Sequence, residues 1–124
     1  MLRIDRITVG AVRVLRSDGT PLLSRCHVAD VRLSRAVGLL FTGRLDPGEG
    51  VIIDPCASVH TFGMRASISV AFLDRERVVL SVHPDVRPWR LARHRGAAVA
   101  VEAAADVLAP VGVGERLQFA PPEG

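Results

Sequence analysis

The sequence has no lysine and no tyrosine, and its 124 residues include one tryptophan, four phenylalanines and two cysteines. Because aromatic residues are scarce, a core has to be assembled mainly from Val, Leu, Ile and Ala. Cys26 and Cys56 are too few for a disulfide framework. All basic side chains are Arg, which we attribute to a GC-rich genome, although Arg also binds phosphate and carboxylate groups in a planar, bidentate manner.

Long hydrophobic runs are absent as well. No apolar run approaches the ~20 residues that a membrane helix requires, and residues 1–6 lack an apolar signal core. We therefore expect a cytoplasmic protein with no membrane partner. A net charge of +3 with thirteen acidic residues interspersed argues against a nucleic-acid partner. The length suits one domain, residues 1–124, with a disordered tail at residues 120–124.

Short apolar segments separated by turn residues predict a mainly β fold. Along one of these segments, residues 22–28, Cys26 is expected to face inward with Leu22, and His27 to face outward with Leu23. The strands are predicted at residues 11–15, 22–28, 51–53, 58–64, 68–73, 78–82 and 97–101, with a last strand ending at residue 119.

Two segments have helical features. Residues 30–38 begin with Asp30, a good N-cap, and place apolar residues at helical spacing. Residues 103–109 are rich in alanine, which favours a helix, and Pro110 would end it. The fold class predicted is α+β and mainly β: a small curled sheet or barrel of short strands with one or two short helices.

Several segments are similar to a known family. The run Val59-His60-Thr61-Phe62-Gly63-Met64-Arg65, the later Arg87-Pro88-Trp89-Arg90 and the segments at residues 34–40, 70–74 and 114–117 together resemble the bacterial domain-of-unknown-function 192 family, over residues 28–117. The resemblance implies a compact β-rich fold and an association with pilus or secretion machinery, and it implies no settled activity. The chain departs from the family at residues 66–69, where an acidic residue is missing, and at residues 102–106.

Cys56, His60 and Met64 carry the soft ligand atoms that suit Cu(I). His60 and Met64 would share one face if residues 58–64 formed a single strand. A zinc site would also need Cys26 and His27, whose spacing differs from that of paired zinc motifs. Cys56 near His60 also allows a thiol-dependent enzyme. The plainer interpretation is structural, with Met64 in the core and His60 bonded to a carbonyl.

The function we favour is a non-enzymatic binding module that uses no cofactor. No acid–base pair or nucleophile elbow is present. Residues 87–95 are the most basic stretch and contain the single tryptophan, which would provide an apolar contact beside side chains that bind negative charge. The ligand would be a protein segment or a small anionic group. The predicted ligand-binding residues are His60, Thr61, Phe62, Arg65, Arg87, Trp89 and Arg90.

Overall fold

A computed structural model describes residues 8–30 and 45–123, and in these ranges it contains nine strands and no helix. Valine, isoleucine, leucine and alanine dominate the buried strands, as a core poor in aromatic residues requires. The strands are β1 (Thr8–Leu15), β2 (Pro21–Asp30), β3 (Glu49–Asp54), β4 (Ser58–His60), β5 (Ile68–Leu73), β6 (Val79–Val86), β7 (Leu91–Arg93), β8 (Val99–Ala104) and β9 (Gln118–Ala120).

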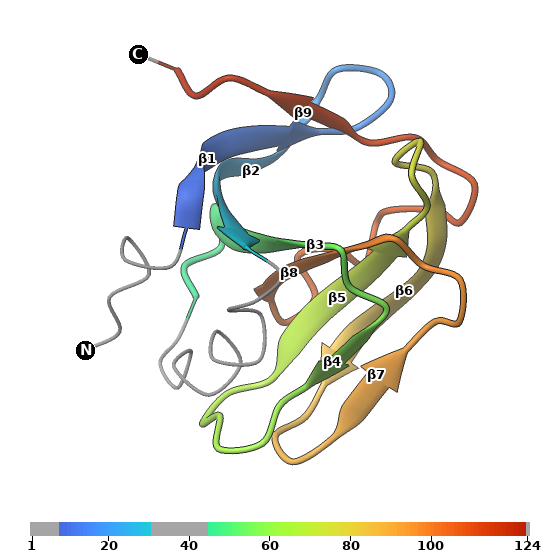
Figure 1. Ribbon diagram of the computed structural model, residues 1–124. Helices are drawn as coiled ribbons and strands as arrows, with labels where there is room; N and C mark the ends of the chain where they lie inside the picture. The colour runs from blue at the N-terminus through green and yellow to red at the C-terminus, as the bar shows by residue number, and fades with distance from the viewer. Residues whose placement is uncertain (1–7, 31–44, 124) are drawn as a thin grey trace.

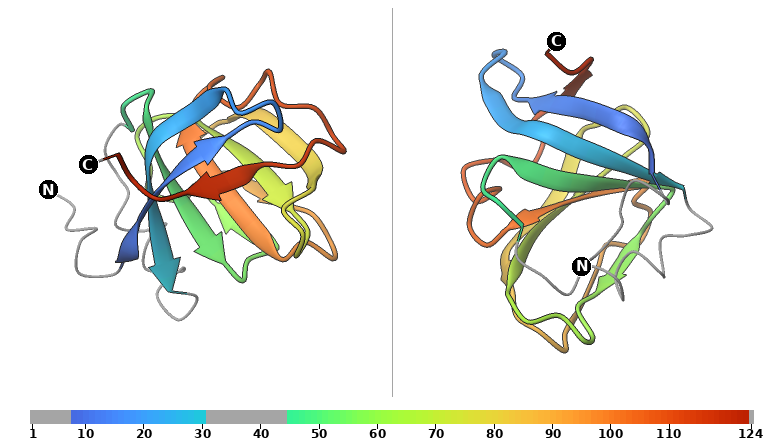
Figure 2. Two further views of the ribbon diagram at one scale, coloured as in Figure 1. Left: turned by 90° about the horizontal axis from the view of Figure 1, so that it is seen from above. Right: turned by 90° about the vertical axis from the view of Figure 1, so that its left-hand side faces the viewer.

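Seven strands form one curled half-barrel sheet in the order β6-β5-β8-β3-β2-β1-β9, and β4 and β7 form a separate two-stranded ribbon (Figures 1 and 2). All neighbouring pairs of the large sheet are antiparallel except β2 and β3. The segment before β9 joins the two edges of the sheet. The N–H of Val79 donates to the carbonyl of Glu115, and the N–H of Leu117 donates to the carbonyl of Arg77.

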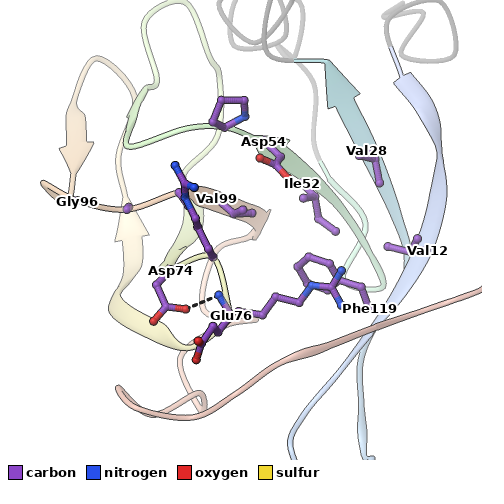
Figure 3. A pocket seen from close by; sticks show the side chains of 14 residues that line it. Val12, Val28, Ile52, Asp54, Asp74, Glu76, Gly96, Val99 and Phe119 are labelled. Carbon is purple, nitrogen blue, oxygen red and sulfur yellow. Dashed lines mark hydrogen bonds between the residues drawn. The ribbon is translucent and has the colours of Figure 1, made fainter.

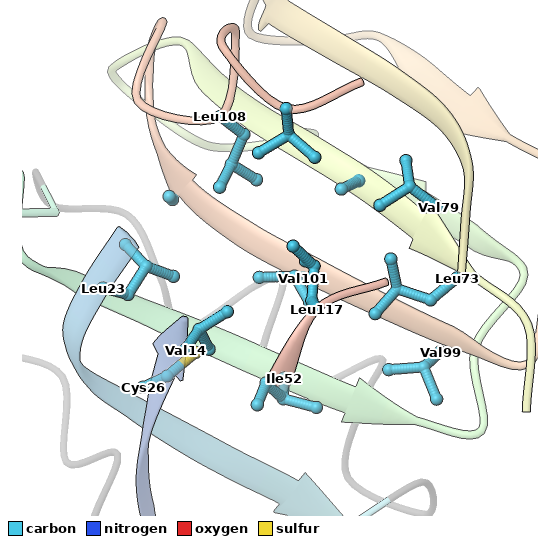
Figure 4. Close-up of a cluster of buried hydrophobic side chains, with 13 residues drawn as sticks. Val14, Leu23, Cys26, Ile52, Leu73, Val79, Val99, Val101, Leu108 and Leu117 are labelled. Atoms are coloured by element: carbon cyan, nitrogen blue, oxygen red, sulfur yellow. The ribbon is translucent and has the colours of Figure 1, made fainter. Parts of the chain in front are cut away.

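The sheet has a buried cluster on each face. The first cluster takes residues from six strands of the sheet and from the segment before β9, so it fills the inside of the curl (Figure 4). Ala71 belongs to this cluster, whereas its neighbours Val70 and Phe72 belong to a second cluster, because successive side chains of a strand point to opposite faces. The second cluster includes Val59 of β4 and Ala92 of β7, which pack the ribbon against the outer face.

An irregularity in the β1–β2 pairing changes the expected alternation in β2. Val12 pairs with Cys26, but Val14 pairs with Leu23, so β2 uses one residue more than β1 between these two points. Leu23 and Cys26 are consequently both fully buried. The prediction that Cys26 faces inward is confirmed, and the prediction that Leu23 faces away from it is wrong.

The predicted helices have different outcomes. Residues 31–38 lie outside the described residues, and Asp30 ends β2. The helix expected at residues 103–109 is wrong: β8 continues to Ala104, and turns follow. Pairing of β8 with both β3 and β5 outweighs the helix propensity of alanine. Within residues 8–30 and 45–123, no helix is long and apolar enough to cross a membrane.

The strand expected over residues 58–64 is also shorter than predicted. β4 ends at His60, and the chain then turns, with the N–H of Met64 donating to the carbonyl of Thr61. Met64 therefore lies outside β4, and the prediction that His60 and Met64 share one face of a single strand is wrong. The strand predicted at residues 68–73 is confirmed at both ends.

Candidate functional site

Three aromatic rings that are separated in sequence stack in one row. The ring centroids of His60 and Phe62 are 5.0 Å apart with an interplanar angle of 29°. The centroids of Phe62 and Trp89 are 5.8 Å apart with an angle of 22°. We call His60, Phe62 and Trp89 the ring row. These distances lie in the range of favourable offset stacking.

The β4–β7 ribbon brings the two segments of the ring row together. His60, the last residue of β4, pairs with Leu91, the first residue of β7. Phe62 and Trp89 lie just beyond these paired ends, in the turns that follow β4 and precede β7. The ribbon is short, so the position of the rings also depends on contacts between the two turns.

Thr61 makes those contacts. Its hydroxyl donates to the carbonyl of Arg87 at 2.6 Å and accepts the N–H of Arg90 at 2.9 Å. Its backbone N–H donates to the carbonyl of Arg90, and its carbonyl accepts the N–H of Trp89 at 3.1 Å. Trp89 adopts a φ of 63°, which is uncommon for a non-glycine residue. The hydrogen bonds of Thr61 on both sides hold Trp89 in this conformation.

The ring row is an exposed apolar surface. Trp89 is 65% exposed and Phe62 is 43% exposed, and Leu91, opposite His60 in the ribbon, is 56% exposed. Thr61 has no exposed surface at all, so its hydrogen bonds join the two turns from inside the fold. Contiguous exposed apolar side chains of this size mark an interaction site more often than isolated ones do.

Three arginines lie within three residues of Phe62 or Trp89 in the sequence, and two of them line a groove. Arg65, Arg87 and Arg90 are all exposed. A groove of about 560 Å³ runs between β6 and β7. Arg87, Arg90 and Leu91 line it together with residues 82–86 and Ala92. The Nε of Arg87 lies 3.8 Å from a carboxylate oxygen of Asp85, a long contact between exposed groups. The guanidinium groups thus remain accessible to a negatively charged ligand.

His60 is partly buried, and its Nδ1 atom is buried with no hydrogen-bond partner among the described residues. The carbonyl partner expected from the sequence is therefore not found within residues 8–30 and 45–123. A proton on Nε2 rather than on Nδ1 avoids a buried N–H without an acceptor. The ring then contributes its face to the ring row and its Nε2–H as a donor.

Two residues of the alternative metal and thiol sites, Met64 and Cys56, make contacts within the fold. Met64 is buried in the cluster beneath the ribbon. The thiol of Cys56 donates to the carbonyl of Ser58 at 3.0 Å, and burial raises the pKa of this thiol above its ordinary value. A raised pKa opposes formation of the nucleophilic thiolate. The described residues hold no group of three or more His, Cys, Asp or Glu side chains suited to a metal ion. The copper, zinc and thiol-enzyme alternatives stay predictions.

Comparison with known proteins identifies the family. The sequence profile of domain-of-unknown-function 192, described as an uncharacterised family, matches residues 13–119. The chain belongs to this family, as the resemblance in its sequence indicated. No curated protein matches the chain significantly.

Two solved structures share the fold. A protein of unknown function from Novosphingobium aromaticivorans has a TM-score of 0.73 and 20% identity, covering 87% of this chain and 83% of that chain. A proposed transcription regulator from Sinorhizobium meliloti has a TM-score of 0.68 and 19% identity, covering 88% of this chain and 92% of that chain. At this level of identity, the likeness shows the fold alone.

Proposed function

We propose that this protein is a cytoplasmic, non-enzymatic binding module that recognises a protein segment through the ring row. The observation that carries the proposal is the stacking of three rings, one at the end of β4 and two in the turns beyond the ribbon, with Phe62 and Trp89 exposed to solvent. An isolated exposed aromatic residue needs no explanation. A row of ordered rings exposes a larger apolar area to water, which is unfavourable in the absence of a ligand.

The chemistry of the surface defines the ligand. Phe62, Trp89 and Leu91 offer apolar contacts, and Arg65, Arg87 and Arg90 offer charge-assisted hydrogen bonds to carboxylates. A segment with an aromatic or aliphatic side chain next to an acidic residue satisfies both. The groove between β6 and β7 is lined by Arg87, Arg90 and Leu91, which lie next to Trp89 in the sequence, so an extended chain bound at the rings has room to continue there. Proteins of the pilus or secretion machinery, with which the resemblance associates this family, would supply such segments.

Trp89 provides a direct assay, because it is the only tryptophan and the chain has no tyrosine. Random 12-residue peptides displayed on phage would be selected against the immobilised protein, and selected peptides would be titrated while the fluorescence of Trp89 is recorded. We expect enrichment of peptides that combine an apolar residue with Asp or Glu, and a saturable change in emission.

Two variants make the result specific. Phe62→Ala keeps the fluorescent reporter and removes the middle ring, and we expect it to weaken the selected peptide by about tenfold, as for an interface residue that carries binding energy. Val113→Ala is the matched control, because Val113 is an exposed apolar residue (72%) in the turn before β9. Equal affinities of both variants, or a selection with no enriched motif, would refute the proposal.

A further inference from the structure

A second concave region lies at one end of the curled sheet, away from the residues of the ring row. Its volume is about 1020 Å³, and we call it the mouth pocket (Figure 3). Its apolar wall comes from five strands of the sheet. The members of this wall are Val12, Val28, Ile52, Val99 and Phe119. Ligand sites in β-barrels commonly lie at such a mouth, and a volume of this order accommodates a small molecule.

The turn between β5 and β6 supplies the polar side of the mouth pocket. Asp74 and Glu76 line it, but their carboxylates already have partners. Asp74 accepts the N–H groups of Glu76 and Val78 at 2.8 and 3.0 Å. A carboxylate oxygen of Glu76 lies 3.3 Å from a guanidinium nitrogen of Arg116.

Arg75 and Arg77 line the same pocket, and neither forms an ion pair with a described residue. The guanidinium of Arg77 lies 4.4 Å from the centroid of the Phe119 ring. Stacking on an aromatic face holds a guanidinium in place and leaves the N–H groups at its edge free to donate. The turn thus places a fixed positive group beside an apolar wall.

The backbone of Arg77 is equally well fixed. Its φ is 67°, its N–H donates to the carbonyl of Asp74 at 3.0 Å, and its carbonyl accepts the N–H of Leu117. Hydrogen bonds from Cys56 to Ala98 and from Ala98 to Leu73, each 2.8 Å long, hold together the opposite part of the rim. The mouth pocket is therefore preformed, which lowers the entropic cost of binding.

Charge is distributed unevenly along the mouth pocket. Asp54 lies at the end of β3, whereas Arg77 is stacked on Phe119 in β9, and β3 and β9 are separated by β2 and β1 in the sheet. An anionic group is favoured at the Phe119 end and disfavoured near Asp54. We propose that the mouth pocket binds an amphipathic monocarboxylate, with its carboxylate at Arg77 and its apolar body along Ile52, Val28 and Val12. This site is independent of the ring row.

Octanoate is a suitable probe, and octanamide is its neutral counterpart of the same shape. The protein would be labelled at the methyl groups of isoleucine and valine, and each compound would be titrated by NMR. We expect octanoate to shift the methyl signals of Ile52, Val12 and Val28 saturably while the indole signal of Trp89 stays in place. Octanamide should bind about tenfold more weakly, because it lacks the charge-assisted hydrogen bond.

Arg77→Asn removes the guanidinium but keeps a residue that tolerates a positive φ. We expect it to weaken octanoate by about tenfold and to leave octanamide binding unchanged, which also shows that the pocket is intact. Arg93→Gln is the control with the same loss of charge, since Arg93 does not line the pocket. Absence of methyl shifts, equal affinity for the two compounds, unchanged octanoate affinity in Arg77→Asn, or a shift confined to Trp89 would each overturn the proposal.

Discussion

Replacement of Glu102 by Gln should make the protein more stable at neutral and alkaline pH. Glu102 lies in β8, between β3 and β5, and is 3% exposed. Its cross-strand partners are Val51 and Val70, both fully buried. Burial in this apolar position raises the pKa of its carboxyl from 4.5 to about 7.

The pKa difference determines the magnitude and the sign of the effect. Below pH 4.5 the carboxyl is protonated in both the folded and the unfolded chain, so it does not change stability. Between pH 4.5 and 7 the unfolded chain loses this proton before the folded chain does, and the free energy of unfolding falls as pH rises. A pKa rise from 4.5 to about 7, at about 1.4 kcal/mol per pKa unit, gives a loss of about 3 kcal/mol above pH 7.

Urea unfolding of the wild type and Glu102→Gln, followed by far-UV circular dichroism from pH 4 to pH 8.5, measures this effect. Across that range, we expect the free energy of unfolding of Glu102→Gln to rise by about 3 kcal/mol relative to that of the wild type. Any effect of the Gln amide on the free energy of unfolding that does not change with pH cancels, because only the dependence on pH is compared. Burial raises the pKa values of the Cys26 and Cys56 thiols above the pH range scanned, and the nearby Glu102 carboxylate raises them further. Parallel pH profiles for the two proteins would refute the reasoning.

Three further substitutions test the support of the fold. Thr61→Val should destabilise the protein by about 2 kcal/mol, because the N–H of Arg90 loses its hydroxyl acceptor. It should also loosen Trp89, which would be seen as lower fluorescence anisotropy. Thr61→Ser keeps the hydroxyl and should retain the stability and the anisotropy of the wild type. Gly50→Ala should lower the free energy of unfolding in urea by more than about 2 kcal/mol, since the added Cβ would lie 2.5 Å from the Glu102 carbonyl oxygen. Gly112→Ala, with open space around its Cβ, should be nearly neutral. Glu115→Gln should lower the melting temperature at pH 7 but not near pH 2. Hydrogen bonds from Arg16 lower the pKa of Glu115 to about 2, and the stability that they provide is lost as pH falls through that value. An equal loss at both pH values would contradict this explanation.

The sequence predicts much of the sheet, because strand formation here follows local apolar patterns. Residues 68–73 alternate between two buried faces, and their composition alone predicts this strand. The errors occur where pairing with distant strands overrides local preference. Alanine favours a helix at residues 103–109, yet β8 is already paired with β3 up to Ala103 and with β5 up to Ala104. The bulge that buries Leu23 with Cys26 likewise depends on β1, which no pattern within β2 reveals.

The candidate sites divide in the same way. The residue types at His60, Phe62 and Trp89 point to a recognition surface, and the structure brings the three rings together. The sequence did not show that Thr61 is buried and joins the two turns, because this role depends on two backbone groups far along the chain. The mouth pocket was also missed. The positive φ of Arg77 and its stacking on Phe119 are tertiary features with no local sequence signal.

Rigidity links these features to binding. Ordering a flexible side chain on association costs roughly 0.5–1.5 kcal/mol. Thr61 and Met64, which flank Phe62, are both buried and attach the turn to neighbouring residues, while Phe62 between them stays exposed. Stacking then holds each ring against the next. A ligand that contacts the ring row therefore meets side chains whose conformations are already ordered, so more of the contact energy is available as affinity. This alternation of buried supports and exposed rings explains how a small sheet with only five Phe and Trp residues presents an ordered apolar surface.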